Sequence, residues 1–335
     1  MYNINSGYGQ MLAYQIASAV GPIFGKIHVV ISTSDESIKI NMLQQMFKPD
    51  PNGDVRFFNT IEDAYDACTT NADDIILLAG YANHIIAEGM DWSKSRIHVL
   101  GMDAGGRLVQ QGAKIQSTDG AADAYVMKVT GTRNTFENVK FIQADTDAAA
   151  LFVVQAAGEA TRYKNCSFIF EVADNLDETT ACEVLVGEDS GHFENCSFGT
   201  DILLTSAARN IMKFDAVTGS ASGEGAKSNR FVNCEWIVMS STADAVLIKL
   251  VDTAGAKFLN EFVDPRFMAV INATGSAIAI TNAVQSVASF VEGTFAFFRP
   301  VTANCTNFCD TLNAKFMVCG TAAISSNGFE GVAPA

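Results

Sequence analysis

One short pattern recurs along this chain and limits what it can fold into. An aromatic residue is followed two positions later by Asn and three positions after that by a second aromatic. The copies read FENVKF (136–141), YKNCSF (163–168), FENCSF (193–198), FVNCEW (231–236) and, in degraded form, FLNEFV (258–263). Their asparagines are Asn138, Asn165, Asn195, Asn233 and Asn260, at spacings of 27, 30, 38 and 27 residues. The Gly- and Ser-rich stretch 218–229 accounts for the long interval as a surface loop.

Strand-like runs separate the copies, with turn residues between them and almost no helical periodicity. The leucine lattice of leucine-rich repeats is missing, and a propeller blade needs about 40 residues. A period near 27 therefore predicts an all-β fold, a parallel β-helix in which successive coils stack at roughly 4.8 Å.

In stacked coils, equivalent positions of successive repeats lie above one another and carry similar side chains. We therefore interpret the motif as structural. Asn tolerates the left-handed conformation that a sharp bend between two strands needs. We expect the asparagines to share amide hydrogen bonds along the axis. Cys166, Cys196 and Cys234 would form an interior column between two columns of aromatic rings.

A short helix is expected ahead of the first coil. Thr60 fits an N-cap with Asp63 three residues on, and Ile61, Ala64, Tyr65 and Cys68 share one face. Strands are expected at 26–32, 55–58, 74–80, 83–89 and 96–101, and a helix at 35–47.

The predicted organisation has three parts. Residues 1–54 form an attachment or oligomerisation segment, 55–300 the parallel β-helix, and 301–335, where the Asn-Cys rhythm is lost, a C-terminal cap or tail.

Net charge −15 argues against nucleic acid as a partner and disfavours an acidic polysaccharide such as pectate. No apolar run reaches the roughly 18 residues of a membrane span. No Lys or Arg precedes Lys26, so the charged region of a secretory signal is missing and a cytoplasmic origin is expected.

The 8 cysteines are too sparse for a disulfide scaffold. Cys305, Cys309 and Cys319 superficially resemble a metal knuckle, but no histidine follows Cys196, so small buried thiols are the preferred interpretation. No metal and no cofactor is predicted.

Two stretches resemble known families. Residues 56–103 resemble the start of pectin-lyase-like right-handed β-helices, with the cap and first coil represented by Thr60, Ile61, Ala64, Asp74, Ile76, Leu78 and Tyr81, and with Gly80 displaced from its usual place. The chain, with residues 25–60 ahead of the cap, also resembles β-helical structural proteins of tailed-bacteriophage particles. The first resemblance implies the fold, which hosts lyases, esterases, hydrolases and fibres alike.

Neither of the active-site sets known in that superfamily can be mapped. Lyases combine calcium-binding carboxylates with a basic residue, whereas hydrolases and esterases cluster aspartates on successive coils. The basic residues near the coils have the turn and alternate-strand positions of solvated side chains: Arg133, Lys140, Arg162, Lys164, Lys213, Arg230 and Lys249.

Other polar groups give no clearer site. The densest acidic stretch, with Glu171, Asp174, Asp177 and Glu178, could hold a carboxylate pair or calcium but lacks a ligand pattern with a pivotal Gly. The four histidines, His28, His84, His98 and His192, are scattered, and the glycines of 101–108 indicate a turn. No catalytic residue is therefore predicted.

These observations predict a non-enzymatic structural protein of a bacteriophage virion, such as a capsid decoration, head fibre or tail-associated subunit. Residues 1–54 would contact other virion proteins, and family analogy suggests a homotrimer without nucleic-acid or membrane partners. The first alternative is a polysaccharide-active enzyme, a depolymerase or lyase, with two or more carboxylates within about 10 Å in a groove. The second is a glycan-binding adhesin, which would need exposed Trp or Tyr, although Trp236 is expected to be buried and Trp92 is the other tryptophan.

Overall fold

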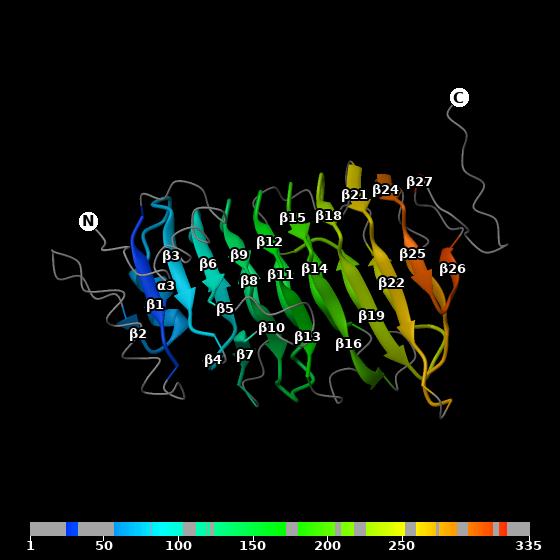
Figure 1. Cartoon of the computed structure of the whole chain (residues 1–335), viewed down its shortest axis with the longest axis horizontal. Coiled ribbons are helices and arrows are strands. Elements are labelled where there is room, and N and C mark those ends of the chain that lie inside the picture. The colour runs from blue at the N-terminus through cyan, green and yellow to red at the C-terminus, as the bar shows by residue number, and fades with distance from the viewer. Residues whose placement is uncertain are drawn as a thin grey trace, which may run out of the picture.

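The chain forms a solenoid of parallel strands. The computed structural model describes residues 25–32, 57–80, 82–102, 112–118, 120, 124–171, 180–204, 209–217, 226–251, 259–272, 275–286, 294–310 and 315–319. Every strand pairing in these ranges is parallel, and the strands make three sheets. Figure 1 shows the coils following one another along the long axis, from blue at the N-terminal end to orange at the other.

Sheet A has 11 strands and contains the first half of each Asn motif. In spatial order they are β2 (Phe57–Phe58), β1 (Ile27–Val30), β3 (Asp74–Leu78), β6 (Ile97–Gly101), β9 (Thr135–Glu137), β12 (Arg162–Lys164), β15 (His192–Glu194), β18 (Arg230–Val232), β21 (Leu259–Val263), β24 (Thr294–Phe298) and β27 (Lys315–Cys319).

Sheet B has 8 strands and contains the second half of each motif. They are β4 (Ala82–Ile86), β7 (Ala113–Ser117), β10 (Lys140–Gln143), β13 (Ser167–Phe170), β16 (Ser197–Leu204), β19 (Glu235–Ser240), β22 (Arg266–Val270) and β25 (Val301–Ala303).

Sheet C also has 8 strands, and it closes each coil. They are β5 (Met90–Trp92), β8 (Tyr125–Val129), β11 (Phe152–Ala156), β14 (Cys182–Val186), β17 (Asn210–Phe214), β20 (Val246–Leu250), β23 (Ile280–Ser286) and β26 (Cys305–Cys309). The predicted right-handed parallel β-helix is confirmed. The expected strands are present, and β5 is an additional strand that was not predicted.

The corner between sheets A and B is a single left-handed residue. Asn138, Asn165, Asn195 and Asn233 have φ of 58°, 51°, 54° and 52°. Asn165 Nδ2 donates to Asn138 Oδ1 over 3.1 Å, as expected for amides stacked along the axis. The motif Asn is thus the residue that lets the chain turn within one position.

The fifth copy of the motif was assigned wrongly. Asn260 lies inside β21, and the register pairs Phe231 with Phe262. The corner residue of that coil is Asp264, with φ 52°, so the copy is FVDPRF (262–267) and not FLNEFV. Like Asn, Asp has a short polar side chain that makes the left-handed region accessible. A search for Asn alone therefore misses this corner.

Two columns of stacked rings fill the interior. The sheet A column has centroid separations of 4.5–5.3 Å and consists of Phe136, Tyr163, Phe193, Phe231, Phe262 and Phe297. The sheet B column has separations of 5.0–5.2 Å and consists of Phe141, Phe168, Phe198, Trp236 and Phe267. All these side chains are fully buried. Truncating one such ring to Ala costs about 3–5 kcal/mol.

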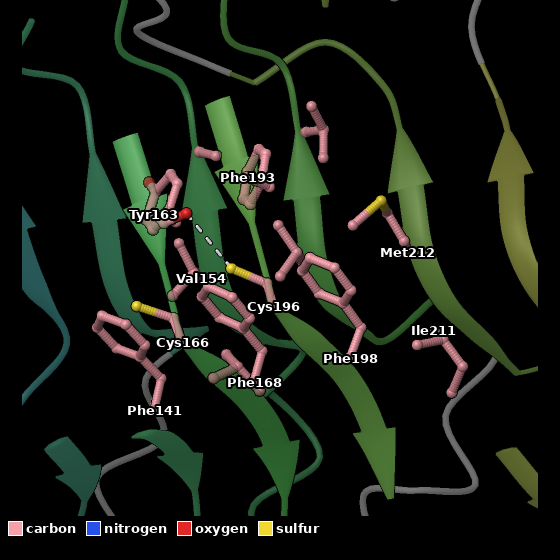
Figure 2. Packing of buried hydrophobic residues seen from close by; sticks show 14 of the residues in the cluster. Phe141, Val154, Tyr163, Cys166, Phe168, Phe193, Cys196, Phe198, Ile211 and Met212 are labelled. Carbon is pink, nitrogen blue, oxygen red and sulfur yellow. Dashed lines mark hydrogen bonds between the residues drawn. The ribbon is translucent and has the colours of Figure 1, made fainter. Parts of the chain in front are cut away.

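The predicted cysteine column lies between the aromatic columns. Cys166, Cys196 and Cys234 are buried, and each thiol donates to a carbonyl oxygen of the preceding coil. Figure 2 shows Cys196 reaching the carbonyl of Tyr163, a contact of 3.4 Å. These cysteines are packing residues that also satisfy a backbone acceptor.

Helix α3 (Ile61–Ala67) is the predicted capping helix. Thr60 Oγ1 accepts from the backbone N–H of Asp63 over 3.1 Å, which confirms the N-cap. Tyr65 packs on Trp92 with ring centroids 4.3 Å apart, so α3 covers the apolar interior at the first coils.

The solenoid extends beyond the range 55–300. β1 pairs with β3 although it lies within 1–54, and β25, β26 and β27 continue the three sheets past residue 300. The helix expected at 35–47, most of 101–108 and most of the 218–229 loop lie outside the described residues.

The corner geometry predicts an unusual order of stabilities at Asn195. Ala normally stabilises a protein relative to Gly by about 0.5–1 kcal/mol. At φ 54° the Ala side chain is strained by about 1–2 kcal/mol, so Asn195→Ala should unfold at a lower temperature than Asn195→Gly. Thermal unfolding followed by circular dichroism compares the two. A more stable Ala variant would contradict the left-handed corner.

Candidate functional site

The outward face of sheet C carries a row of polar side chains. The row lies toward the C-terminal end of the solenoid. The register places Lys213, Lys249 and Gln285 on adjacent strands β17, β20 and β23. Their neighbours Met212 and Ile248 belong to the interior core, because side chains alternate between the faces of a strand. Three long polar side chains therefore lie roughly 4.8 Å apart along the axis.

A pocket of about 340 Å³ opens on this face between β20 and β23. Its lining is Ala243, Asp244, Val246, Lys249, Thr281, Asn282 and Gln285. Asp244 belongs to the turn before β20, and the others lie beside or on the two strands. The volume is within the range of roughly 300–1,000 Å³ usual for small-molecule sites.

The functional groups in the pocket are one carboxylate, one ammonium, one hydroxyl and two side-chain amides. Asn282 Oδ1 accepts from Asn307 Nδ2 over 3.2 Å, which fixes its orientation. Within the described part of the chain, the side chains of Asp244, Lys249 and Gln285 make no hydrogen bond or ion pair with another residue. These three side chains line the pocket, where a bound ligand would contact them.

Two neighbouring side chains shape the electrostatics of the site. Lys213 is 9% exposed and donates to the carbonyl of Thr180 over 2.5 Å; burial, and to a lesser extent the charge of Lys249, lower its pKa. Asp310 accepts from the backbone N–H of Ser286, which follows Gln285. Burial raises the pKa of Asp310, against the effect of its bonds to Ser286. A second carboxyl group thus lies beside the pocket strand.

The charged side chains of sheet A do not form a comparable site because they pair with one another. Arg162 donates to Glu194 over 2.7 Å, and Lys164 lies 3.4 Å from Glu137. Burial alone would raise the pKa of Glu194, but the hydrogen bond and charge of Arg162 lower it. Charges matched across strands stabilise the sheet and leave little for a ligand.

Two carboxyl groups with raised pKa lie inside the solenoid. Burial raises the pKa of Glu183 to about 7, although Arg209 lies 2.9 Å away and opposes the shift. Burial raises the pKa of Glu188 as well, and the charge of Asp189 adds to it. Both side chains are 0% exposed, so a substrate has no access to them. Raised pKa alone therefore does not identify the site.

The basic residues named in the sequence analysis differ in how exposed they are in the structure. Arg162, Lys164 and Arg230 are partly exposed on sheet A, as expected for solvated side chains. The same interpretation is wrong for Lys213, which is buried, and incomplete for Lys249, which lines the pocket.

The histidines and the acidic stretch do not converge on a site. His28, His84 and His98 are buried, whereas His192 is partly exposed on sheet A. Glu171 is exposed, and Asp174, Asp177 and Glu178 lie outside the described residues.

Cys305 and Cys309 are free thiols that pack against the core from β26. Burial raises their pKa to about 11 and about 12. Cys305 and Cys309 are only partly buried, so the preference for small buried thiols is met in part for these two, and the side chain of Cys319 lies outside the described residues.

Solved structures with the same fold include carbohydrate esterases. A pectin methylesterase from Aspergillus niger matches with a TM-score of 0.55 and 12% identity, over 92% of this chain and 88% of that chain. A pectin methylesterase in complex with a hexasaccharide matches with a TM-score of 0.53 and 12% identity, over 91% of this chain and 92% of that chain. No protein-family model and no curated protein sequence matches. The fold is that of the pectin-lyase-like right-handed β-helices.

These comparisons correct the prediction of a non-enzymatic virion protein. The structures that match at TM-scores of 0.50–0.55 are pectin methylesterases, which favours the alternative of a polysaccharide-active enzyme. The sequence-based argument took the failure to map a known active-site set onto the sequence as evidence against an enzyme. The pocket joins residues from two turns of the solenoid.

A phage protein, Geobacillus virus E2 ORF18, also matches, with a TM-score of 0.39 and 10% identity over 84% of this chain and 63% of that chain. Similarity at this level carries no argument about function. The virion location, the contacts of residues 1–54 and the homotrimer stay predictions.

Two further expectations concern surfaces. Within the described residues, no helix is long and apolar enough to cross a membrane. Trp236 is fully buried, as predicted, and so is Trp92, so neither tryptophan offers the exposed ring that the adhesin alternative requires.

The buried Glu183 predicts a pH dependence of stability. An unfolded Glu loses its proton near pH 4.5, whereas folded Glu183 keeps it to about pH 7. The folded state therefore binds the extra proton between these values, and stability falls as pH rises through this window. Glu183→Gln removes the dependence, so wild type should lose stability relative to this variant from pH 4.5 to 7. Urea unfolding at several pH values measures the difference; a constant or growing wild-type advantage would contradict the shift.

Proposed function

We propose that the protein is a polysaccharide-active enzyme that hydrolyses an ester on a glycan chain bound at the sheet C pocket. The observation that carries the proposal is the composition of the pocket: Asp244, Lys249, Asn282 and Gln285 converge there from β20, β23 and the turn before β20. Amide, carboxylate and ammonium groups are suited to hydrogen bonding with sugar hydroxyl groups. The similarity to pectin methylesterases, enzymes with this fold, supports the same class of substrate.

Ester hydrolysis fits the pocket better than cleavage of a glycosidic bond. Glycoside hydrolases use two carboxyl groups that flank the scissile bond. The described lining of this pocket has a single carboxylate, Asp244, together with cationic and amide donors. An ester needs one base to activate water and donors to stabilise the oxyanion, which is the set present here.

The proposed roles follow from this chemistry. Asp244 accepts a proton from water, whose oxygen attacks the ester carbonyl carbon. Lys249 Nζ and Gln285 Nε2 donate to the oxyanion that develops on the carbonyl oxygen. The carbonyl then re-forms as the C–O bond to the alcohol breaks, and Asp244 returns the proton to the alcohol oxygen. A methyl ester thus releases methanol and leaves an acid on the glycan, whereas an acetyl ester releases acetate and leaves a hydroxyl group. Exposure of Asp244 gives water access to the base.

The charge of the protein is compatible with an esterified substrate. Net charge −15 opposes a polyanion, but a methyl-esterified uronic acid and an acetylated neutral sugar carry no charge at the ester. The acidic product of a methyl ester would be repelled by the acidic surface, which favours its release.

The test is hydrolysis of methyl-esterified polygalacturonic acid and acetylated xylan, with released methanol or acetate measured. We expect Asp244→Asn to lower kcat by about 10²–10⁴-fold through loss of the base. Lys249→Met should lower it by about 10²–10³-fold through loss of an oxyanion donor. Lys164→Met, on sheet A, is the matched control and should retain wild-type activity.

Three results would contradict the proposal. Folded protein that releases neither product from a wider panel of esterified glycans would exclude the esterase function. Full activity in Asp244→Asn would place the reaction elsewhere. Shortened glycan chains without ester loss would indicate a depolymerase instead.

A further inference from the structure

A buried cluster of three possible metal ligands lies at the N-terminal end of the solenoid. His28 comes from β1, Cys68 follows α3, and Asp74 begins β3. One donor atom of each residue lies within 4.8 Å of the others. In the described part of the chain, this is the one group of three or more His, Cys, Asp and Glu side chains arranged so closely.

The donors are of the types that bind zinc. Zinc takes imidazole nitrogen, thiolate sulfur and carboxylate oxygen, with bonds of about 2.0–2.3 Å in a tetrahedron. Such bonds hold the donors roughly 3.3–3.7 Å apart, so donor separations of up to 4.8 Å would shorten by at most about 1.5 Å on binding. His28, Cys68 and Asp74 are 3%, 5% and 1% exposed, so the three donors are shielded from bulk solvent.

The surroundings hold Asp74 in a position from which it can bind a cation. Its Oδ1 accepts from the backbone N–H of Lys26 over 2.6 Å, and its Oδ2 accepts from that of Thr69 over 2.7 Å. Each oxygen keeps a second lone pair, and these two bonds fix the direction of the carboxylate. Supporting hydrogen bonds of this kind are common around metal ligands.

Cys68 can exchange its proton for a metal ion. Its thiol donates to the carbonyl oxygen of Ala64 over 3.2 Å. On metal binding the proton leaves to solvent and the thiolate becomes the ligand. The carbonyl oxygen of Ala64 then loses this donor, and a water molecule would supply the fourth ligand beside the three side chains.

We propose that His28, Cys68 and Asp74 bind a zinc ion that ties β1, the end of α3 and β3 together. The three ligands belong to separate elements of the chain, so a metal joins elements that otherwise meet through sheet hydrogen bonds and packing. Such a site would stabilise the cap of the solenoid. It is independent of the proposed esterase function.

The experiment uses the full chain, stripped with chelator and titrated with Co²⁺ as a spectroscopic probe for zinc. We expect one equivalent to bind, with the visible bands of tetrahedral cobalt and a near-ultraviolet thiolate-to-cobalt band. Zn²⁺ should displace the cobalt and raise the unfolding temperature.

Variants assign the signal to the cluster. Cys68→Ser keeps a hydroxyl donor for Ala64 and should lose the thiolate band and the zinc-dependent stabilisation. Cys182→Ser is the matched control, because Cys182 is a buried free cysteine on sheet C, and it should bind like wild type.

Two results would overturn the proposal. One is a wild-type protein that shows no thiolate-to-cobalt band at stoichiometric Co²⁺, an outcome that does not depend on how any variant folds. The other is an unchanged band in Cys68→Ser. Ester hydrolysis assayed on the same stripped protein keeps this result separate from the function proposed above.

Discussion

The structure depends on parallel, in-register stacking of coils. Each coil must turn at the same place for its strands to pair with those of the next, and one left-handed residue provides that turn between sheets A and B. The shared register brings like side chains together, so flat rings stack at 4.5–5.3 Å, close to the strand spacing. Backbone pairing, corner conformation and ring packing thus enforce the same period.

Much of this fold could be predicted from the sequence because the constraint repeats. The aromatic columns, the cysteine column and the left-handed Asn corners follow from one motif read at its own spacing. The cap was predictable from Thr60 and the face of α3. The misplaced fifth copy shows the limit, since Asp264 serves as well as Asn at the corner and only strand register distinguishes it from Asn260.

The candidate site could not be predicted in the same way. A functional residue occurs once, so it leaves no periodic signal. Lys249 and Gln285 are 36 positions apart and become neighbours only through the pairing of β20 with β23. From sequence, Lys249 has the same alternate-strand position as Lys164, yet Lys164 pairs with Glu137 whereas Lys249 lines a pocket. The ion-pair partner and the surroundings of a lysine, which the sequence does not show, distinguish a solvated side chain from one that lines a pocket.

The contrast between the two faces defines the functional account. On sheet A the charges neutralise one another; at the C-terminal end of sheet C, a carboxylate, an ammonium and amides face an open pocket. The most direct test is a crystal structure of Asp244→Asn with a methyl-esterified or acetylated oligosaccharide. The account predicts the glycan on sheet C, with its ester carbonyl between residue 244 and Lys249. A glycan bound on sheet A, or an empty pocket at saturating ligand, would contradict it.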